Sequence, residues 1–350
     1  MKTDATSAKF DMKRAKRGVE RVLEICERPG RVLILMQDNP DPDAIASAAA
    51  VRELVASHLH KRALIGYGGI CGRAENRAMM TTLHIEAHRV TPSDVLCAKT
   101  VCLVDCQPYT GNNALHTARA AEIVIDHHLL PRPAVWTAEF ADVRPEYGAT
   151  STILYEYLRA ACVDISENLA TALFYGVQSD TQDLGRQAAS PDICAFQDLF
   201  LLANKKKLAR IRRAAVPPRY FAALQGGLTH CVVAGKTVIS YIPEHGTPDM
   251  MAEVADLMLR LSGTRVSVCY GLYGDVIHIS VRGYDARSNV GRRLKRAVRG
   301  LGTGGGHRSM AGGQVPTLGT AERRLALVRE RLLRVFAAGN EPHPLLDLAD

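Results

Sequence analysis

The sequence predicts an α/β protein with an N-terminal, mostly parallel sheet flanked by helices, a helical linker, and a smaller C-terminal α/β domain with a mixed sheet. Two observations predict this fold class. In the first part of the chain, short apolar runs alternate with helix-like stretches, as a parallel sheet covered on both faces requires. Further along, strand-like runs return in pairs, and Tyr273-Gly274-Asp275 has the composition of a hairpin turn.

Each expected element follows from its local pattern. Continuous apolar runs predict strands over residues 32–36, 63–65, 101–104 and 123–125 in the first part, and over 231–233, 237–242, 265–272 and 276–281 in the second. Apolar residues at the helical period predict helices, among them 44–59, 74–83, 149–161 and 167–177. These patterns divide the chain into domains at 1–186 and 229–338, a helical linker at 187–228 and a loose tail at 339–350.

The composition is that of a globular protein with a basic balance. The 350 residues carry 44 Lys and Arg against 36 Asp and Glu, a formal net charge of +8, and 47% of them are hydrophobic. The longest apolar runs are far shorter than the roughly 18 to 20 residues that span a bilayer, and the charged start of the chain does not have the pattern of a secretory signal. We therefore expect a cytoplasmic protein with no membrane partner. The nine cysteines form no C-x-x-C pair, so we interpret them as reduced, mostly buried thiols.

Acidic residues follow several of the predicted strands. They are Asp41 and Asp43 after the first strand, Asp105 at the end of the third, and Asp126-His127-His128 at the end of the fourth. Because the carboxyl ends of parallel strands share one edge of a sheet, where ligands bind, we expect these groups to converge. Asp180 ends a helical pattern, and a chain reversal there could bring it to the same edge.

Converging carboxylates repel one another, so such a cluster needs cations. Carboxylates with one or two imidazoles suit Mn²⁺ or Mg²⁺ better than structural zinc. Two ions about 3.5–4 Å apart would share one carboxylate, and a hydroxide between them would attack phosphorus. Taken singly, Asp43 could cap a helix and Asp105 could be a turn residue, but their joint occurrence in order with the other clusters favours a metal site.

Five motifs, in the same order, resemble those of the DHH phosphoesterase superfamily, and in particular the branch of bifunctional oligoribonuclease (nanoRNase) and 3′-phosphoadenosine-5′-phosphate (pAp) phosphatase. Four lie in the first domain, and they are Gln37 to Ser47, Val104-Asp105, Asp126-His127-His128 and Gly176 to Thr181. The fifth, Gly304 to Gly312, resembles the glycine-rich signature of the DHH-associated domain. The resemblance implies a catalytic, metal-binding domain over 1–186 and a substrate-binding domain over 229–338.

The resemblance also implies a role for each site residue. Two Mn²⁺ ions are expected, with Mg²⁺ as an alternative. The expected ligands of the first ion are Gln37, Asp41 and Asp105, and those of the second are Asp43, Asp105, His127 and Asp180. Asp105, which would bridge the two ions, and His128, which would face the scissile phosphate, are the expected catalytic residues. The residues expected to hold the substrate's terminal phosphate are Arg282, Gly304, Gly305, Gly306 and His307.

The activity that the resemblance implies is that of a manganese-dependent phosphoesterase. It would hydrolyse short oligoribonucleotides to 5′-mononucleotides, pAp to AMP, or both, by two-metal hydroxide attack. Eight basic residues between Arg282 and Arg308, against one acid, would attract such polyanions. An aromatic content of 5% offers no extended stacking platform for long single strands, so short substrates fit better.

One departure from the family's pattern keeps alternatives open. Gln37 stands where the superfamily usually has a histidine, and an amide oxygen is a weaker ligand than an imidazole for such a metal. The chain could therefore be a non-catalytic nucleotide-binding module. Within the superfamily, hydrolysis of linear or cyclic dinucleotides or of polyphosphate is also open. The partners we expect are short RNA oligonucleotides or nucleotide phosphates, and a homodimer is an open alternative.

Overall fold

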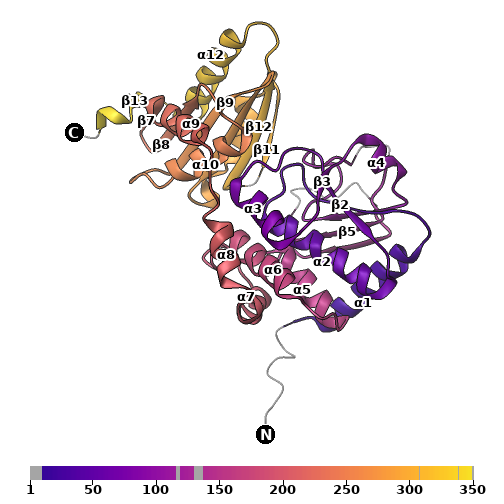
Figure 1. Ribbon diagram of the computed structural model, residues 1–350. Helices are drawn as coiled ribbons and strands as arrows, with labels where there is room; N and C mark the ends of the chain where they lie inside the picture. The colour runs from indigo at the N-terminus through magenta and orange to yellow at the C-terminus, as the bar shows by residue number, and fades with distance from the viewer. Residues whose placement is uncertain (1–9, 116–118, 130–136, 307, 338, 349–350) are drawn as a thin grey trace. The chain divides into compact units, whose positions relative to one another are not determined.

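The structure, a computed structural model, describes residues 10–115, 119–129, 137–306, 308–337 and 339–348 (Figure 1). The chain forms two compact units, Met1–Ala214 and Ala215–Asp350. The expected linker over 187–228 holds three helices, of which α7 and α8 belong to the first unit and α9 to the second.

The first unit is built on a six-stranded parallel sheet with the strand order β3-β2-β1-β4-β5-β6. Its strands are β1 (Val32–Leu35), β2 (Ala63–Tyr67), β3 (His88–Arg89), β4 (Thr100–Val104), β5 (Ile123–Asp126) and β6 (Phe140–Val143). From β1 the chain adds β2 and β3 toward one edge of the sheet, and from β4 it adds β5 and β6 toward the other edge. The carboxyl ends of β1 and β4 therefore flank a topological switch point, where open α/β sheets form a crevice.

Helices cover both faces of this sheet. They are α1 (Met12–Glu27), α2 (Pro42–Leu59), α3 (Ala74–Leu83), α4 (Pro92–Cys97), α5 (Thr150–Ala160), α6 (Glu167–Asp180), α7 (Ser190–Leu202) and α8 (Lys205–Arg212). Alternate residues of β1 separate the two cores, since Ile34 packs with α2, α5 and α6, whereas Leu33 and Leu35 pack toward α4. The strands are buried on both faces, which explains their continuous apolar sequences.

The second unit contains a seven-stranded mixed sheet with the order β11-β12-β10-β9-β8-β7-β13, in which only the β8–β9 pair is parallel. Its strands are β7 (Cys231–Ala234), β8 (Thr237–Ile242), β9 (Val266–Tyr273), β10 (Val276–Gly283), β11 (Thr303–Gly306), β12 (Met310–Pro316) and β13 (His343–Pro344). Helices α9 (Pro218–Thr229) and α10 (Pro248–Met258) pack on one face, and α11 (Val290–Ala297) and α12 (Ala321–Leu332) on the other. Three short helical turns complete the unit, and they are η1 (Ala286–Ser288), η2 (Leu333–Ala337) and η3 (Leu346–Leu348).

The predicted fold class is confirmed, and so is the hairpin, since Gly274 lies in the left-handed region between β9 and β10. One local expectation was wrong, and one strand was not predicted. The described part of the tail is not loose, because β13 pairs with β7 and the Leu345 amide donates to the Cys231 carbonyl at 2.8 Å. The sequence predicted no strand at the glycine run over 304–306, which forms the edge strand β11 and pairs with β12. Its glycines lack the β-branched side chains that indicate a strand.

The cysteines agree with the expectation of reduced, mostly buried thiols. All nine cysteines are free, and seven of them are buried. Among the described residues, no helix is both long enough and apolar enough to cross a bilayer.

A buried ionic network joins β6, the turn after it and α5. The Arg144 guanidinium is fully buried, with nitrogens 2.7 Å from Asp142 Oδ2 and 2.5 Å from Glu156 Oε2. It also donates to the Tyr147 hydroxyl at 3.2 Å, and that hydroxyl donates to Glu156 Oε1 at 2.8 Å. Arg144 is the guanidinium that pairs with buried Glu156, whereas Asp142 also pairs with Arg14 at 2.6 Å, so removing Arg144 leaves mainly Glu156 without its cation.

We expect Arg144→Met to lower the free energy of unfolding by about 3–5 kcal/mol, because it removes the cation that pairs with the buried Glu156 carboxylate and one of the two that pair with Asp142. Arg62→Met is the control, since Arg62 and its partner Glu86 have side chains that are 80% and 81% exposed. Breaking that pair should cost less than about 1 kcal/mol. Urea denaturation measures both variants, and equal losses would contradict the interpretation.

Candidate metal centre

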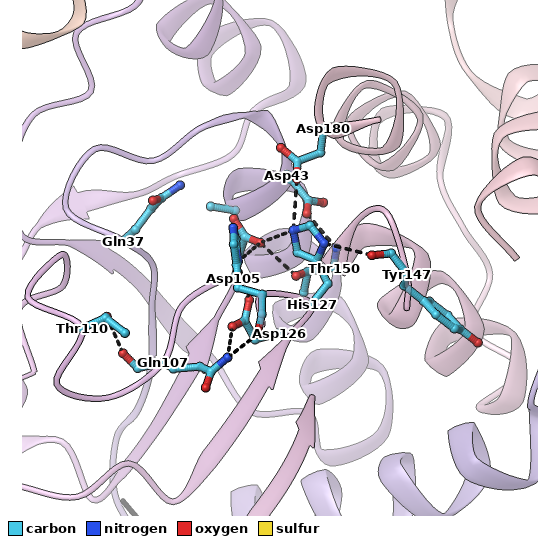
Figure 2. A network of polar contacts seen from close by, with 12 residues as sticks. Gln37, Asp43, Asp105, Gln107, Thr110, Asp126, His127, Tyr147, Thr150 and Asp180 are labelled. Atoms are coloured by element: carbon cyan, nitrogen blue, oxygen red, sulfur yellow. Dashed lines mark hydrogen bonds and ion pairs between the residues drawn. The ribbon is translucent and has the colours of Figure 1, made fainter. Parts of the chain in front are cut away.

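The residues expected to bind metal in the first unit lie around the switch point of the parallel sheet, and the closely spaced groups include Asp43, Asp105, His127 and Asp180 but not Asp41. Gln37 follows β1, Asp105 follows β4, and His127 and His128 follow β5. Asp41 and Asp43 lie at the start of α2, and Asp180 is the last residue of α6. Figure 2 shows Asp43, Asp105, His127 and Asp180 directed toward one another. The site contains two groups of three residues, and within each group the donor atoms lie within 4.8 Å of one another. One group is Asp43, His127 and Asp180, and the other is Asp105, His127 and His128.

The carboxylates of Asp41 and Asp43 are oriented by helix N-termini. Asp41 is the N-cap of α2, where its Oδ1 accepts from the Ala44 amide at 3.0 Å. Asp43 is fully buried in the first turn of α2 and accepts from the backbone amides of Thr150 and Ser151, at 2.7 and 2.8 Å, at the start of α5. Asp43 therefore lies at the positive ends of two helices, which favour an anion there.

Asp105 has an orphaned oxygen. Its backbone is left-handed, with φ +57°, and the residue is 1% exposed. Oδ1 accepts from the Thr150 hydroxyl at 2.9 Å, whereas buried Oδ2 has no hydrogen-bond partner among the described residues. Since an unsatisfied buried carboxylate oxygen is costly, a bound cation would fit at this atom.

The His127 ring is oriented like that of a metal ligand. Its Nδ1 lies 3.2 Å from the Tyr147 carbonyl oxygen, to which it can only donate. In the neutral ring that binds a metal, Nε2 would therefore carry the free electron pair, and this atom lies 3.0 Å from Asp180 Oδ2 and 3.7 Å from Asp105 Oδ1. A backbone carbonyl that fixes the second ring nitrogen is the usual partner of a metal-bound histidine.

His128 is held by a chain of buried hydrogen bonds. Its Nδ1 contacts Asp126 Oδ1 at 2.8 Å. Gln107 is 3% exposed and donates both to Asp126 Oδ2 at 2.6 Å and to the His128 carbonyl at 2.7 Å. Asp126 thus orients the His128 ring through Nδ1, and Gln107 holds both Asp126 and the His128 backbone in place.

The sequence did not reveal three residues that orient the candidate ligands, Gln107, Tyr147 and Thr150. Gln107 lies two positions after Asp105, and this closeness to a strand-end aspartate was the one available signal. Tyr147 acts through its carbonyl, which every residue has, so no residue type could indicate it. Thr150 is 107 positions from Asp43, and only the packing of α5 against α2 brings them together.

The site takes up protons when it holds no cation. Burial raises the pKa of Asp43 to about 6, and the nearby Asp180 charge adds to the shift. Burial and the charge of Asp43 also raise the pKa of Asp105. Burial lowers the pKa of His127, but the hydrogen bond and charge of Asp180 outweigh it and raise the value to about 10. Because oxygen ligands with imidazoles suit Mn²⁺ or Mg²⁺, the residues present fit divalent ions in place of these protons.

The residues expected to hold a terminal phosphate belong to the second unit. Arg282 lies in β10, where its Nε donates to Asp256 Oδ1 at 2.6 Å and a terminal nitrogen donates to Ser280 Oγ at 2.9 Å. Gly304, Gly305 and Gly306 form β11, and Gly306 has a φ of +134°. His307 lies outside the described residues. The role of all five residues stays a prediction.

A buried cluster of carboxylates and imidazoles at the switch point of a parallel sheet is an arrangement that can hold divalent ions for chemistry at a phosphoryl group. Residues 31–177 match the DHH family, N-terminal domain, and residues 234–335 match the DHHA1 domain. The chain belongs to the DHH superfamily, as its motifs predicted.

Two curated relatives are similar to this chain. An uncharacterized protein of Methanocaldococcus jannaschii is 35% identical over 291 residues, which are 83% of this chain and 59% of that protein. A "Probable manganese-dependent inorganic pyrophosphatase" of Lactobacillus delbrueckii subsp. bulgaricus is 28% identical over 150 residues, which are 43% of this chain and 47% of that protein. The chain thus matches between about half and three-fifths of the length of these relatives.

Solved structures share the fold. An exopolyphosphatase-related protein from Bacteroides fragilis matches with a TM-score of 0.68 and 16% identity, over 91% of this chain and 96% of that one. Exonuclease RecJ bound to manganese matches with a TM-score of 0.52 and 17% identity, over 96% and 97% of the two chains. At such identities the likeness shows the fold alone.

We expect Mn²⁺ to raise the melting temperature more at pH 8 than at pH 5. The pKa of Asp43 is about 6 in the folded protein, above its unfolded value of about 3.9, so the metal-free protein loses stability as pH rises through that window. The raised pKa of His127 gives stability that is full below about pH 6.5 and is lost as pH rises toward 10. Mn²⁺ bound at these groups would replace the protons. Calorimetry with EDTA or Mn²⁺ at each pH tests this, and an equal gain at both would contradict it.

Proposed function

We propose that the chain is a manganese-dependent phosphoesterase that releases 5′-mononucleotides from short oligoribonucleotides and dephosphorylates pAp to AMP. The observation that carries the proposal is the cluster of Asp43, Asp105, His127 and Asp180, in which one buried carboxylate oxygen has no hydrogen-bond partner within the described part of the chain. Divalent ions bound there would offset the carboxylate charge and polarise a phosphoryl group.

The candidate ligands divide into two sets that share Asp105. Gln37, Asp41 and Asp105 would hold one ion, and Asp43, Asp105, His127 and Asp180 the other. The two sets differ in how they are arranged. In the second set, the α5 amides orient Asp43 and the Tyr147 carbonyl orients His127. In the first, the Gln37 side-chain amide donates to Asp41 Oδ2 at 2.9 Å.

His128 would hold a proton toward the substrate. Burial lowers its pKa, but the hydrogen bond to Asp126 outweighs this and raises it. Asp126 remains ionised because, although burial opposes it, the bond from His128 lowers its pKa. An imidazolium that is held by Asp126 through Nδ1 would donate through its other ring nitrogen, Nε2, to a phosphoryl oxygen of the substrate. A cation that is fixed in this way suits an anionic phosphate.

The second unit would recognise the rest of the substrate. Exposed basic residues of the tract between Arg282 and Arg308, among them Arg287, Arg292 and Arg299, would attract a polyanion, with binding that weakens as salt rises. Arg282, the β11 glycines and His307 are the candidates for the terminal phosphate. A second candidate function is hydrolysis of inorganic pyrophosphate or polyphosphate, since one relative is named a manganese-dependent inorganic pyrophosphatase.

The test offers 5′-phosphorylated di- to pentaribonucleotides, pAp, a cyclic dinucleotide, pyrophosphate and polyphosphate, each with Mn²⁺, to the full chain. We expect release of mononucleotides from the RNA and of AMP from pAp, and Asp105→Ala should lower the rate by at least about 10²-fold. Asp164→Ala, in an exposed loop, is the matched control and should leave the rate unchanged. Turnover of pyrophosphate or polyphosphate alone would favour the second candidate.

Gln37→His separates an enzyme with a weak first ion from a non-catalytic nucleotide-binding module. A histidine at this position would offer a ring nitrogen where Gln37 offers a donor to Asp41. We expect the apparent affinity for Mn²⁺ in the hydrolysis assay to rise by about 10–100-fold. Tight nucleotide binding without turnover in both proteins would favour the non-catalytic module, and an unchanged Mn²⁺ requirement would show that glutamine serves as well as histidine.

A further inference from the structure

We propose that Thr150 is a positioning residue that sets two metal ligands at once. Its hydroxyl donates to Asp105 Oδ1 at 2.9 Å, and its backbone amide donates to Asp43 Oδ2 at 2.7 Å. Asp105 follows β4 and Asp43 lies in α2, so one residue of α5 joins ligands from two other elements. The inference rests on the part of the proposed function that concerns divalent ions.

The Thr150 hydroxyl fixes the rotation of the Asp105 carboxylate. The last torsion of an aspartate side chain is broad, so burial alone does not select one orientation. By binding Oδ1, Thr150 leaves Oδ2 as the buried oxygen without a partner among the described residues. It also keeps Oδ1 near both imidazoles, 3.7 Å from His127 Nε2 and 3.8 Å from His128 Nδ1. A carboxylate that is to contact two ions must be held in one fixed orientation.

Thr150 does not use its hydroxyl for its own helix. It is the first residue of α5, whose N-cap Ala149 has no side-chain cap. The first two amides of the helix are instead satisfied by Asp43. Figure 2 shows Thr150 beside Asp43, Asp105 and His127. A hydroxyl aimed out of its own helix at a candidate ligand indicates a role in the site rather than in helix capping.

The helix supplies a matched control two residues further on. Thr152 is also fully buried, and its hydroxyl donates to buried Asp192 at 2.6 Å. Asp192 is not among the candidate ligands. Valine has the shape of threonine without the donor, so Thr150→Val and Thr152→Val each remove one buried hydrogen bond to a carboxylate. Both variants keep the backbone amides, including the Thr150 amide that donates a hydrogen bond to Asp43.

The experiment titrates Mn²⁺ into the metal-free full chain by isothermal calorimetry, with electron paramagnetic resonance of free Mn²⁺ as an independent measure. We expect Thr150→Val to weaken Mn²⁺ binding by about 10–100-fold, the usual effect of losing a group that orients a ligand. Thr150→Ala, which fits a helix well, should do the same, and Thr150→Ser should restore wild-type affinity. Thr152→Val should lose thermal stability but bind Mn²⁺ as the wild type does.

The outcomes separate this inference from the proposed function. Wild-type affinity in Thr150→Val and Thr150→Ala, or an equal loss of affinity in Thr152→Val, would overturn the role of Thr150. If the wild type binds Mn²⁺ but hydrolyses none of the substrates, the proposed function fails and the affinities still decide the role of Thr150. If the wild type binds no Mn²⁺, both fail.

Discussion

Repulsion among buried carboxylates is the constraint on which the organisation of the first unit depends. The charges of Asp41, Asp43, Asp105 and Asp180 are close enough to raise one another's cost of ionisation. The fold offsets part of this cost by placing Asp41 and Asp43 at helix N-termini and by setting imidazoles beside Asp180 and Asp105. Asp105 Oδ2 has no hydrogen-bond partner among the described residues, so these protein groups do not fully offset the carboxylate charge. Divalent ions are the cations that fit what remains.

The switch point and small residues make this convergence possible. Because the strand order reverses between β1 and β4, no crossover helix covers their carboxyl ends. Helix α6 approaches α2 closely enough that a Cβ on Gly176 would lie 3.2 Å from the Asp43 Cα and 2.3 Å from Ser151 Oγ. Behind the site, the Arg144 network holds the turn that presents the Tyr147 carbonyl to His127. The candidate ligands thus depend on a second layer of packed and ionic contacts.

The sequence predicted the candidate ligands that lie at the ends of strands and helices, but not the residues that orient them through tertiary contacts. Asp105 and Asp126 could be placed because buried parallel strands are continuous apolar runs, so their ends are visible. Asp180 could be placed because its helix ends there. Thr150 and Gln107 could not, since their partners lie on other elements and any buried polar residue would have looked the same. Strand β11 was missed because glycines carry no signal for a strand.

The departure at Gln37 makes the two proposed ion positions unequal. The second set needs no rearrangement, because helix amides and a carbonyl already orient Asp43 and His127. In the first set, both Asp41 oxygens accept hydrogen bonds, one from Ala44 and one from Gln37. The Gln37 amide would have to rotate away from Asp41 before its own carbonyl oxygen could face an ion. An ion at the first position would therefore break the Gln37–Asp41 hydrogen bond, which a histidine ligand would not need to do. We therefore expect an ion to bind to the second set of ligands before one binds to the first set.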